Sequence, residues 1–211
     1  MNNSKLNLIS KSKWVFRITV LILIIYYISI NKSIPSMNYI SNGILIIISS
    51  FIPDIICILF KFSLSKYTDF TIQLFIFLSL FLGKMYNFYS LIPWWDLFLH
   101  FLSGIILGFF SLTILKALAK DTIFKQLSPI FIFLFTFLFS VSIAALWEFW
   151  EFAGDQLFGF DSQLYSLIDT MTDMIIGSLG GLIVSIMNFL YVKLGAFKFL
   201  YRFLSYGKEE N

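Results

Sequence analysis

Acidic side chains and the chain's one histidine occur at helical spacings in three short motifs. They are Asp96 with His100, Glu148 with Glu151, and Asp169 with Asp173. Residues three or four apart in a helix share one face, with about 6 Å of axial rise between residues i and i+4. Carboxylate oxygens together with an imidazole nitrogen are ligands for divalent cations. The motifs therefore predict a metal site formed by these six residues, with Mn, Mg, Zn, Fe or Ca as candidate ions.

The same groups are suited to catalysis. A bound metal ion can activate water, and Glu148, Glu151 or His100 could then act as general base or acid. Three plainer interpretations stay open. His100 could be a buried imidazole bonded to Asp96, Asp169 could be a helix N-cap, and the whole set could be a polar helix interface whose carboxylates share protons.

The composition predicts helices that span a membrane. Of the 211 residues, 59% are hydrophobic and 13% are charged, against about 25% charged in a soluble domain, and the mean hydropathy is +0.87. A bilayer requires about 20 mostly apolar residues per helix. We expect an all-α polytopic bundle forming one integral membrane domain over residues 1–211, with about six transmembrane helices. Their expected ranges are 14–31, 40–60, 69–89, 95–115, 128–152 and 169–192.

The basic residues predict the orientation, because Lys and Arg concentrate on the cytoplasmic side of membrane proteins. With both termini inside, thirteen basic residues are cytoplasmic and two, Lys32 and Lys84, are outside. The cytoplasmic set is Lys5, Lys11, Lys13, Arg17, Lys61, Lys66, Lys116, Lys120, Lys125, Lys193, Lys198, Arg202 and Lys208. This N-in, C-in orientation in the cell membrane would place all three acidic motifs at the outer face.

The acidic motifs have no basic residue beside them. No Lys or Arg occurs between Lys125 and Lys193, yet six of the twelve acidic residues do. An unpaired charged group at mid-helix costs about 2.5 to 3.5 kcal/mol on insertion scales, so the carboxylates must face one another or water. Because like charges repel, the cluster requires bound protons, protonated His100, a metal ion or a cationic substrate.

Other segments are less informative. Asp155 continues the Glu148 face into the segment 153–168, which we interpret as a long outer loop that could partly re-enter the membrane. Asp161 in that loop is interpreted as solvated. Asp54, in the second span, is interpreted as a partner for backbone groups beside Pro53.

Several chemistries are excluded by the residues present. One Cys and one His cannot form a disulfide framework or a zinc site that requires two His or paired Cys. Arg occurs only at positions 17 and 202, both predicted to be cytoplasmic, which excludes an arginine-based lipid phosphatase. No phosphate-binding loop of the ATPase type is present, and the net charge of +3 gives no indication of nucleic-acid binding.

The order of the motifs resembles the YjdF-like family of bacterial inner-membrane proteins. The resemblance covers roughly residues 93–184, and Met171 stands where family members often carry Gln. The block consists of Trp95-Asp96, His100, Ser103-Gly104, Glu148, Glu151, Asp169-Thr170, Asp173-Met174 and Gly180-Gly181. The skeleton is also similar to VanZ-like proteins, which are linked to glycopeptide resistance and the cell envelope. The resemblance implies that the six acidic and histidine residues are characteristic, and it implies no reaction.

Three functions remain in competition. The first, which we favour, is a metal-dependent binding or catalytic protein acting on a lipid or cell-envelope substrate at the outer leaflet of the bilayer. The second is a cation- or proton-coupled transporter, which would require polar groups through the full depth of the membrane. The third is a structural or assembly factor in which the cluster only fixes helix packing.

Overall fold

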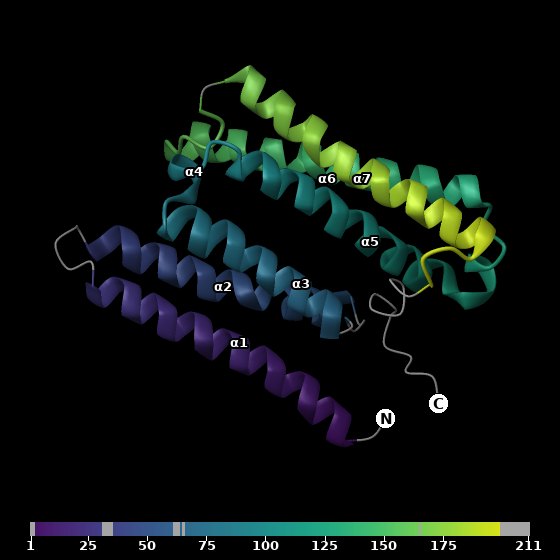
Figure 1. Ribbon diagram of the computed structural model, residues 1–211, viewed down its shortest axis with the longest axis horizontal. Coiled ribbons are helices and arrows are strands. Elements are labelled where there is room, and N and C mark those ends of the chain that lie inside the picture. Colours follow the sequence, from purple (N-terminus) through teal and green to yellow (C-terminus); the bar gives the residue numbers. More distant parts are fainter. Residues whose placement is uncertain (1–2, 31–35, 61–63, 65, 165, 199–211) are drawn as a thin grey trace. The chain divides into compact units, whose positions relative to one another are not determined.

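The protein is built of helices throughout the part of the chain that its structure describes. The computed structural model describes residues 3–30, 36–60, 64, 66–164 and 166–198, and all regular elements among them are helical (Figure 1). Five segments are long and apolar enough to cross a membrane, and α1 (Asn3–Ile30) contributes a shorter apolar stretch, Trp14–Ile30. The five are Tyr39–Leu59, Thr68–Met85, Trp95–Lys116, Pro129–Phe158 and Leu167–Leu194. The expected all-α polytopic membrane bundle is confirmed.

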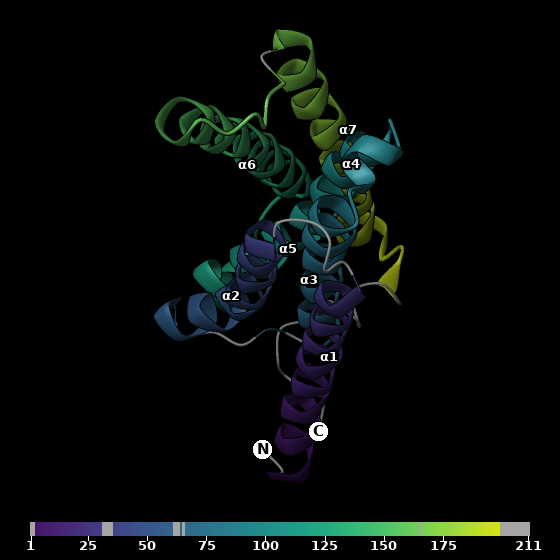
Figure 2. The same cartoon turned by 90° about the vertical axis from the view of Figure 1, so that its left-hand side faces the viewer.

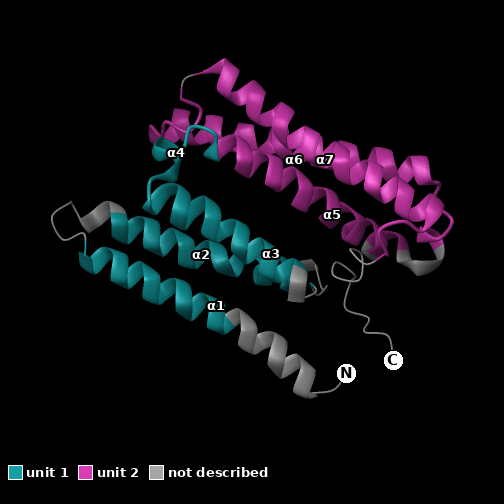
Figure 3. Ribbon diagram, in the orientation of Figure 1, with its two compact units in different colours: residues 1–95 teal, residues 96–211 magenta. Residues whose placement is uncertain are grey.

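The orientation across the membrane stays a prediction. Four basic residues of the charge pattern lie outside the described residues: Lys32, Lys61, Arg202 and Lys208. The helices also divide into two compact units, residues 1–95 and 96–211 (Figure 3). The single membrane domain over residues 1–211 therefore stays a prediction as well, and each unit is described by itself.

Unit 1 contains α1, α2 (Ser36–Phe60), α3 (Lys66–Ile76), the π-helical segment η1 (Phe77–Met85) and the short α4 (Phe88–Leu91). Its apolar core is formed by Val20 and Ile24 of α1, Ile46 of α2, and Phe81 and Met85 of η1. These side chains come from three different segments of the chain. Because lipid tails are as apolar as these side chains, the helices of unit 1 are held together here by van der Waals packing.

A buried ion pair joins α1 to α2. Arg17 is 7% exposed and donates to the Asp54 carboxylate and to the backbone oxygen of Ser50, while Gln73 of α3 donates to the same Ser50 oxygen. The sequence interpretation paired Asp54 with backbone groups beside Pro53, whereas in the structure its carboxylate accepts from the Arg17 side chain. The pair gives the carboxylate in α2 a counter-charge, as a charge within an apolar helix requires.

Unit 2 contains the three helices that carry the acidic motifs: α5 (Trp95–Phe124), α6 (Pro129–Phe158) and α7 (Leu167–Leu194). Ser128 caps α6 by accepting from the Phe131 N–H, and Pro129 occupies the first turn, where its missing N–H costs nothing. Gly159 ends the helix with φ of 68°, a conformation that favours glycine. The expected loop 153–168 is therefore wrong in its extent, because α6 continues to Phe158 and α7 begins at Leu167.

Glycines allow α5 and α7 to approach until their backbones touch. A Cβ atom added at Gly104 would lie 1.9 Å from the Gly177 carbonyl oxygen, and one at Gly180 would lie 2.3 Å from the Phe101 oxygen. On the other side of α7, a Cβ at Gly181 would lie 2.4 Å from the Ser140 Cβ of α6. Small residues at such positions are the usual means of close helix packing in membranes.

Buried polar side chains link the three helices farther along the bundle. Asn188 of α7 donates to the Thr136 hydroxyl of α6 at 2.9 Å, and Ser111 of α5 donates to the same hydroxyl at 3.1 Å. All three side chains are almost fully buried. Interhelical hydrogen bonds of this kind contribute about 0.6 to 2 kcal/mol each in membrane proteins, and here they fix α5, α6 and α7 relative to one another.

Candidate metal centre

The close packing of α5 against α7 brings three of the predicted site residues together. Asp96 lies in the first turn of α5, and His100 follows one turn later. Asp173 lies near the start of α7, one turn before Gly177, where α7 touches α5. Each of the three side chains offers one ligand atom, and these atoms all lie within 4.8 Å of one another. We call Asp96, His100 and Asp173 the triad.

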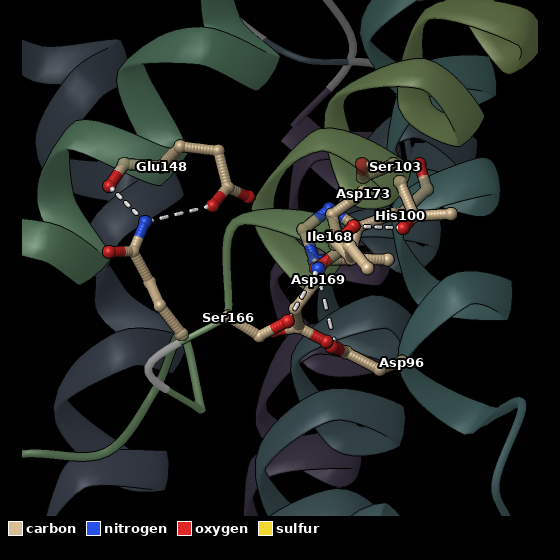
Figure 4. A network of polar contacts seen from close by, with 10 residues as sticks. Asp96, His100, Ser103, Glu148, Ser166, Ile168, Asp169 and Asp173 are labelled. Atoms are coloured by element: carbon tan, nitrogen blue, oxygen red, sulfur yellow. Dashed lines mark hydrogen bonds and ion pairs between the residues drawn. The ribbon is translucent and has the colours of Figure 1, made fainter.

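The geometry of the triad is close to that of a metal site. His100 Nε2 lies 3.6 Å from Asp96 Oδ1 and 3.8 Å from Asp173 Oδ2 (Figure 4). Ligand atoms that each lie about 2.1 Å from a small divalent ion are about 3.0 to 3.5 Å apart. Small side-chain rotations would therefore suffice to close the triad around an ion. Asp173 is 2% exposed and His100 is 9% exposed, whereas Asp96 is half-buried.

Glu148 of α6 is buried beside the triad, with one oxygen lacking a hydrogen-bond partner. It is 3% exposed, and the Thr170 hydroxyl of α7 lies near its carboxylate without the full geometry of a hydrogen bond to Oε1. Its other oxygen accepts from the Gln163 side-chain amide at 3.2 Å. Figure 4 shows the Glu148 side chain extending from α6 toward the side where Asp173 and His100 lie. A buried carboxylate oxygen without a donor is costly, so this atom requires a partner, which the Thr170 hydroxyl or a ligand could supply.

Asp155 fixes the connection between α6 and α7 by accepting hydrogen bonds from its backbone. Its two carboxylate oxygens accept from the backbone N–H groups of Ser162 at 2.8 Å and Gln163 at 3.0 Å. Asp155, which the sequence analysis placed on the face of the acidic cluster, therefore organises the loop instead. By fixing the loop it also places the Gln163 amide against Glu148. No motif in the sequence indicated a role for Gln163, because an amide in a connection carries no periodic signal.

Asp155→Ala should free this loop. Both charge-assisted hydrogen bonds would be lost, each contributing about 1.5 to 3 kcal/mol, so we expect residues 159–164 to become sensitive to proteases in otherwise folded protein. Limited proteolysis followed by mass spectrometry of the fragments measures this. Asp161→Ala is the control, because Asp161 is exposed in the same loop. Equal cleavage of both variants and the wild type would contradict the anchoring role.

The other two predicted site residues lie near the triad without joining it. Asp169 is in the first turn of α7, and Glu151 is half-buried on α6. The interpretation of Asp169 as an N-cap is wrong, since Ser166 caps α7 by accepting from the Asp169 N–H at 3.2 Å. Both carboxylates remain in electrostatic range of Asp96 and Glu148.

Described basic side chains of unit 2 lie far from this cluster. Lys116 is about 30 Å along α5 from Asp96 at 1.5 Å per residue, and it rests over the rings of Phe124 and Tyr191. Lys193 is in the last turn of α7. Among the described residues of unit 2, the five carboxylates thus have His100 as the nearest group able to carry a positive charge. The arrangement is a cation-attracting site at one end of the unit.

Comparison with known proteins finds a relative that matches half of the chain. A protein of Thermotoga maritima (strain MSB8), described as an uncharacterized protein, is 34% identical over 105 residues, which are 50% of this chain and 53% of that protein. The match thus spans about half the length of that relative. No solved structure matches the chain. The YjdF-like and VanZ-like resemblances stay predictions.

The sequence also matches a family model over residues 12–194, a range that includes all six predicted site residues. The model covers parts of both units, from α1 to the end of α7. The chain therefore belongs to the family described as predicted membrane protein (DUF2238).

Proposed function

We propose that the protein binds one divalent cation through Asp96, His100 and Asp173, and uses it on a lipid or cell-envelope substrate. The observation that carries this proposal is the meeting of three ligand atoms, from two helices that are not neighbours in the chain, within 4.8 Å. Two of the three side chains are buried, so their charges require a partner inside the protein.

The charge of the cluster requires a cation, which a metal ion bound by the triad would supply. Five carboxylates from three helices lie in mutual electrostatic range, and the Glu148 Oε1 atom has no hydrogen-bond donor. Protons shared among the carboxylates would reduce the repulsion as well, and metal titration of the purified protein separates the two arrangements. A dication would neutralise the two aspartates of the triad while His100 stays uncharged.

The ligand set favours some ions over others. Ca²⁺ and Mg²⁺ prefer oxygen ligands alone, whereas an imidazole with two carboxylates suits Mn²⁺, Fe²⁺ or Zn²⁺. An ion with three protein ligands keeps positions open for water or substrate. Glu148, whose free oxygen lies on the triad side of α6, could then serve as the general base for a metal-bound water. The positive-inside pattern supports an outer-face location in the cell membrane.

The test is metal binding by protein purified in detergent. After stripping with EDTA, we expect isothermal titration with Mn²⁺ or Zn²⁺ to give one ion per chain. His100→Gln should weaken the affinity by about 100-fold or more, since loss of outer-shell partners alone costs 10- to 100-fold. Asp161→Asn is the matched control in the exposed loop. A wild-type protein that binds none of these ions and shows no thermal shift with them would overturn the proposal.

The two competing functions have less support. A transporter requires a polar path through the span, but one turn below the triad α5 and α7 are in backbone contact at Gly104 and Gly177. A purely structural cluster does not require three ligand atoms to meet within 4.8 Å. Proton or cation flux into liposomes carrying the protein would favour the transporter, and its absence would remove it.

A further inference from the structure

A small cavity lies inside unit 1, where α1, α2, α3 and η1 pack side by side (Figures 1 and 2). Its polar lining residues are Arg17 of α1, Ser50 of α2 and Gln73 of α3, and the rest of the lining is apolar. The space open to the centre of a water molecule is about 10 Å³, and about 10 to 15 Å³ on this measure is enough for one water. The cavity therefore fits a single small molecule.

Two buried polar atoms of the residues that line this cavity have no hydrogen-bond partner among the described residues. They are Arg17 Nε, which is a donor, and Gln73 Oε1, which is an acceptor. Arg17 is 7% exposed and Gln73 is 2% exposed, so neither side chain is open to bulk solvent. A buried donor or acceptor without a partner is costly. Both atoms therefore require a ligand inside the protein.

A shared carbonyl group holds the two side chains next to each other. Arg17 Nη2 donates to the Ser50 backbone oxygen at 2.6 Å, and Gln73 Nε2 donates to the same oxygen at 2.8 Å. The guanidinium of Arg17 and the amide of Gln73 therefore lie side by side. The bond to Ser50 also identifies the two ends of the Gln73 amide, because a carbonyl oxygen accepts only from the amide nitrogen. The atom without a partner is thus the oxygen.

The chemistry of these atoms restricts the ligand. A cation would be repelled by the charge of Arg17, which already has the Asp54 carboxylate as its counter-ion, and an anion would be repelled by the Gln73 oxygen. A ligand that accepts from Nε and donates to Oε1 must carry a hydroxyl group, and the volume of the cavity leaves only water. The Ser50 hydroxyl donates to the Ile47 oxygen at 2.7 Å and keeps lone pairs that can accept a further hydrogen bond. Buried waters typically make about three hydrogen bonds.

We propose that Arg17, Ser50 and Gln73 bind one water molecule inside unit 1. The water accepts from Arg17 Nε and donates to Gln73 Oε1, and it thereby links α1 to α3 beside the carbonyl group of α2 that both residues share. All three helices contribute apolar segments to the membrane protein, where a charged side chain requires polar contacts within the protein. The water completes those contacts for Arg17. The site uses no residue of the triad, so it is independent of the proposed function.

The experiment is X-ray radiolytic footprinting of the whole chain in detergent. A short X-ray pulse converts a bound water into a hydroxyl radical, which oxidises adjacent side chains, and mass spectrometry measures the oxidised fraction of each residue. Phe16 of α1 and Phe77 of η1 line the cavity. Phe81 is the internal control, because it is buried in the same apolar core outside the cavity. We expect Phe16 and Phe77 to be oxidised several-fold more than Phe81, and equal oxidation of all three would overturn the proposal.

Two variants remove the water by different routes. Val20→Ile adds a methyl group at a side chain that lines the cavity, and Gln73→Met removes the acceptor while keeping an unbranched side chain of similar length. Both should lower the oxidation of Phe16 and Phe77 to that of Phe81. Val15→Ile is the matched control, because Val15 is exposed on the same helix, and it should keep the wild-type oxidation. Unchanged oxidation in both cavity variants would show that the radicals come from bulk solvent, and the proposal would fail.

Thermal unfolding of the same proteins gives a second readout, in which the sign decides. Filling a dry apolar cavity stabilises a protein. Filling a hydrated one expels the water and leaves Arg17 Nε and Gln73 Oε1 without a partner, which destabilises the folded state. We expect Val20→Ile to unfold below the wild-type temperature and Val15→Ile to unfold at it. A Val20→Ile protein that unfolds above the wild type would show that the cavity is dry and would overturn the proposal.

Discussion

Asp173→Asn should abolish metal binding and, at the same time, make the metal-free protein more stable. Asp173 is buried within 4.8 Å of the other two ligand atoms of the triad. Without an ion its carboxylate is close to that of Asp96, and two like charges at this distance repel unless the pair binds a proton. The isosteric amide removes that repulsion and can donate to Asp96.

The sign of the effect should reverse when metal is added. A ligand that binds only the folded state at about 1,000 times its Kd stabilises that state by about 4 kcal/mol, and Asp173→Asn would forgo this gain. Thermal unfolding in detergent, with EDTA and then with Mn²⁺ or Zn²⁺, measures both states. We expect the variant to unfold several degrees above the wild type in EDTA and several degrees below it with metal.

The control for this reversal is Asp161→Asn, which removes one negative charge from an exposed loop position and should follow the wild type in both conditions. A purely structural role for the cluster predicts something different. In that case Asp173→Asn would lower the unfolding temperature by the same amount with EDTA and with metal, and the metal site would be contradicted.

The helices could be predicted from the sequence because a run of about 20 mostly apolar residues indicates a helix that spans a membrane. The expected span 95–115 agrees with the apolar segment Trp95–Lys116, while the helix α5 itself continues to Phe124. Likewise α6 continues to Phe158 before Gly159 ends it. Hydropathy marks the apolar centre of a helix, and its ends depend on caps that span only a few residues.

The members of the candidate site were predictable, but their grouping was not. Helical spacing paired Asp96 with His100 and Asp169 with Asp173. Which of these pairs meet depends on how α5 packs against α7, and the contact at Gly104 and Gly177 selects Asp173 in place of Asp169. Packing between helices that are far apart in the chain produces no recurring spacing of residue types, so the sequence alone could not predict this grouping.

Hydrogen-bond and ion-pair partners that lie far apart in the chain could not be predicted from the sequence either. Arg17 was assigned to the cytoplasmic basic set because only its charge could be counted. Its burial against Asp54 depends on how α1 and α2 are aligned along their axes. The role of the Gln163 amide depends in the same way on a loop that Asp155 folds back toward α6.

Gly104→Ala should destabilise unit 2 and weaken metal binding together. The new Cβ would lie 1.9 Å from the Gly177 backbone oxygen, and reaching an ordinary contact of 3.4 Å would require α5 and α7 to separate by about 1.5 Å. Overpacking of this kind typically costs about 1 to 3 kcal/mol. Because Asp173 lies one turn from Gly177, the separation would also move it away from His100.

Gly177→Ala is the matched control on the facing helix. A Cβ there would meet the His100 oxygen at 3.5 Å and the Ala144 Cβ at 3.6 Å, both ordinary contacts, and alanine favours a helix over glycine by about 1 kcal/mol. We expect Gly177→Ala to unfold at or above the wild-type temperature and to keep its affinity for Mn²⁺ or Zn²⁺. Gly104→Ala should have a lower unfolding temperature and a lower affinity for Mn²⁺ or Zn²⁺ than the wild type. If the two variants behave alike, the backbone contact between α5 and α7 does not position the triad, and the grouping of Asp173 with Asp96 and His100 loses its structural cause.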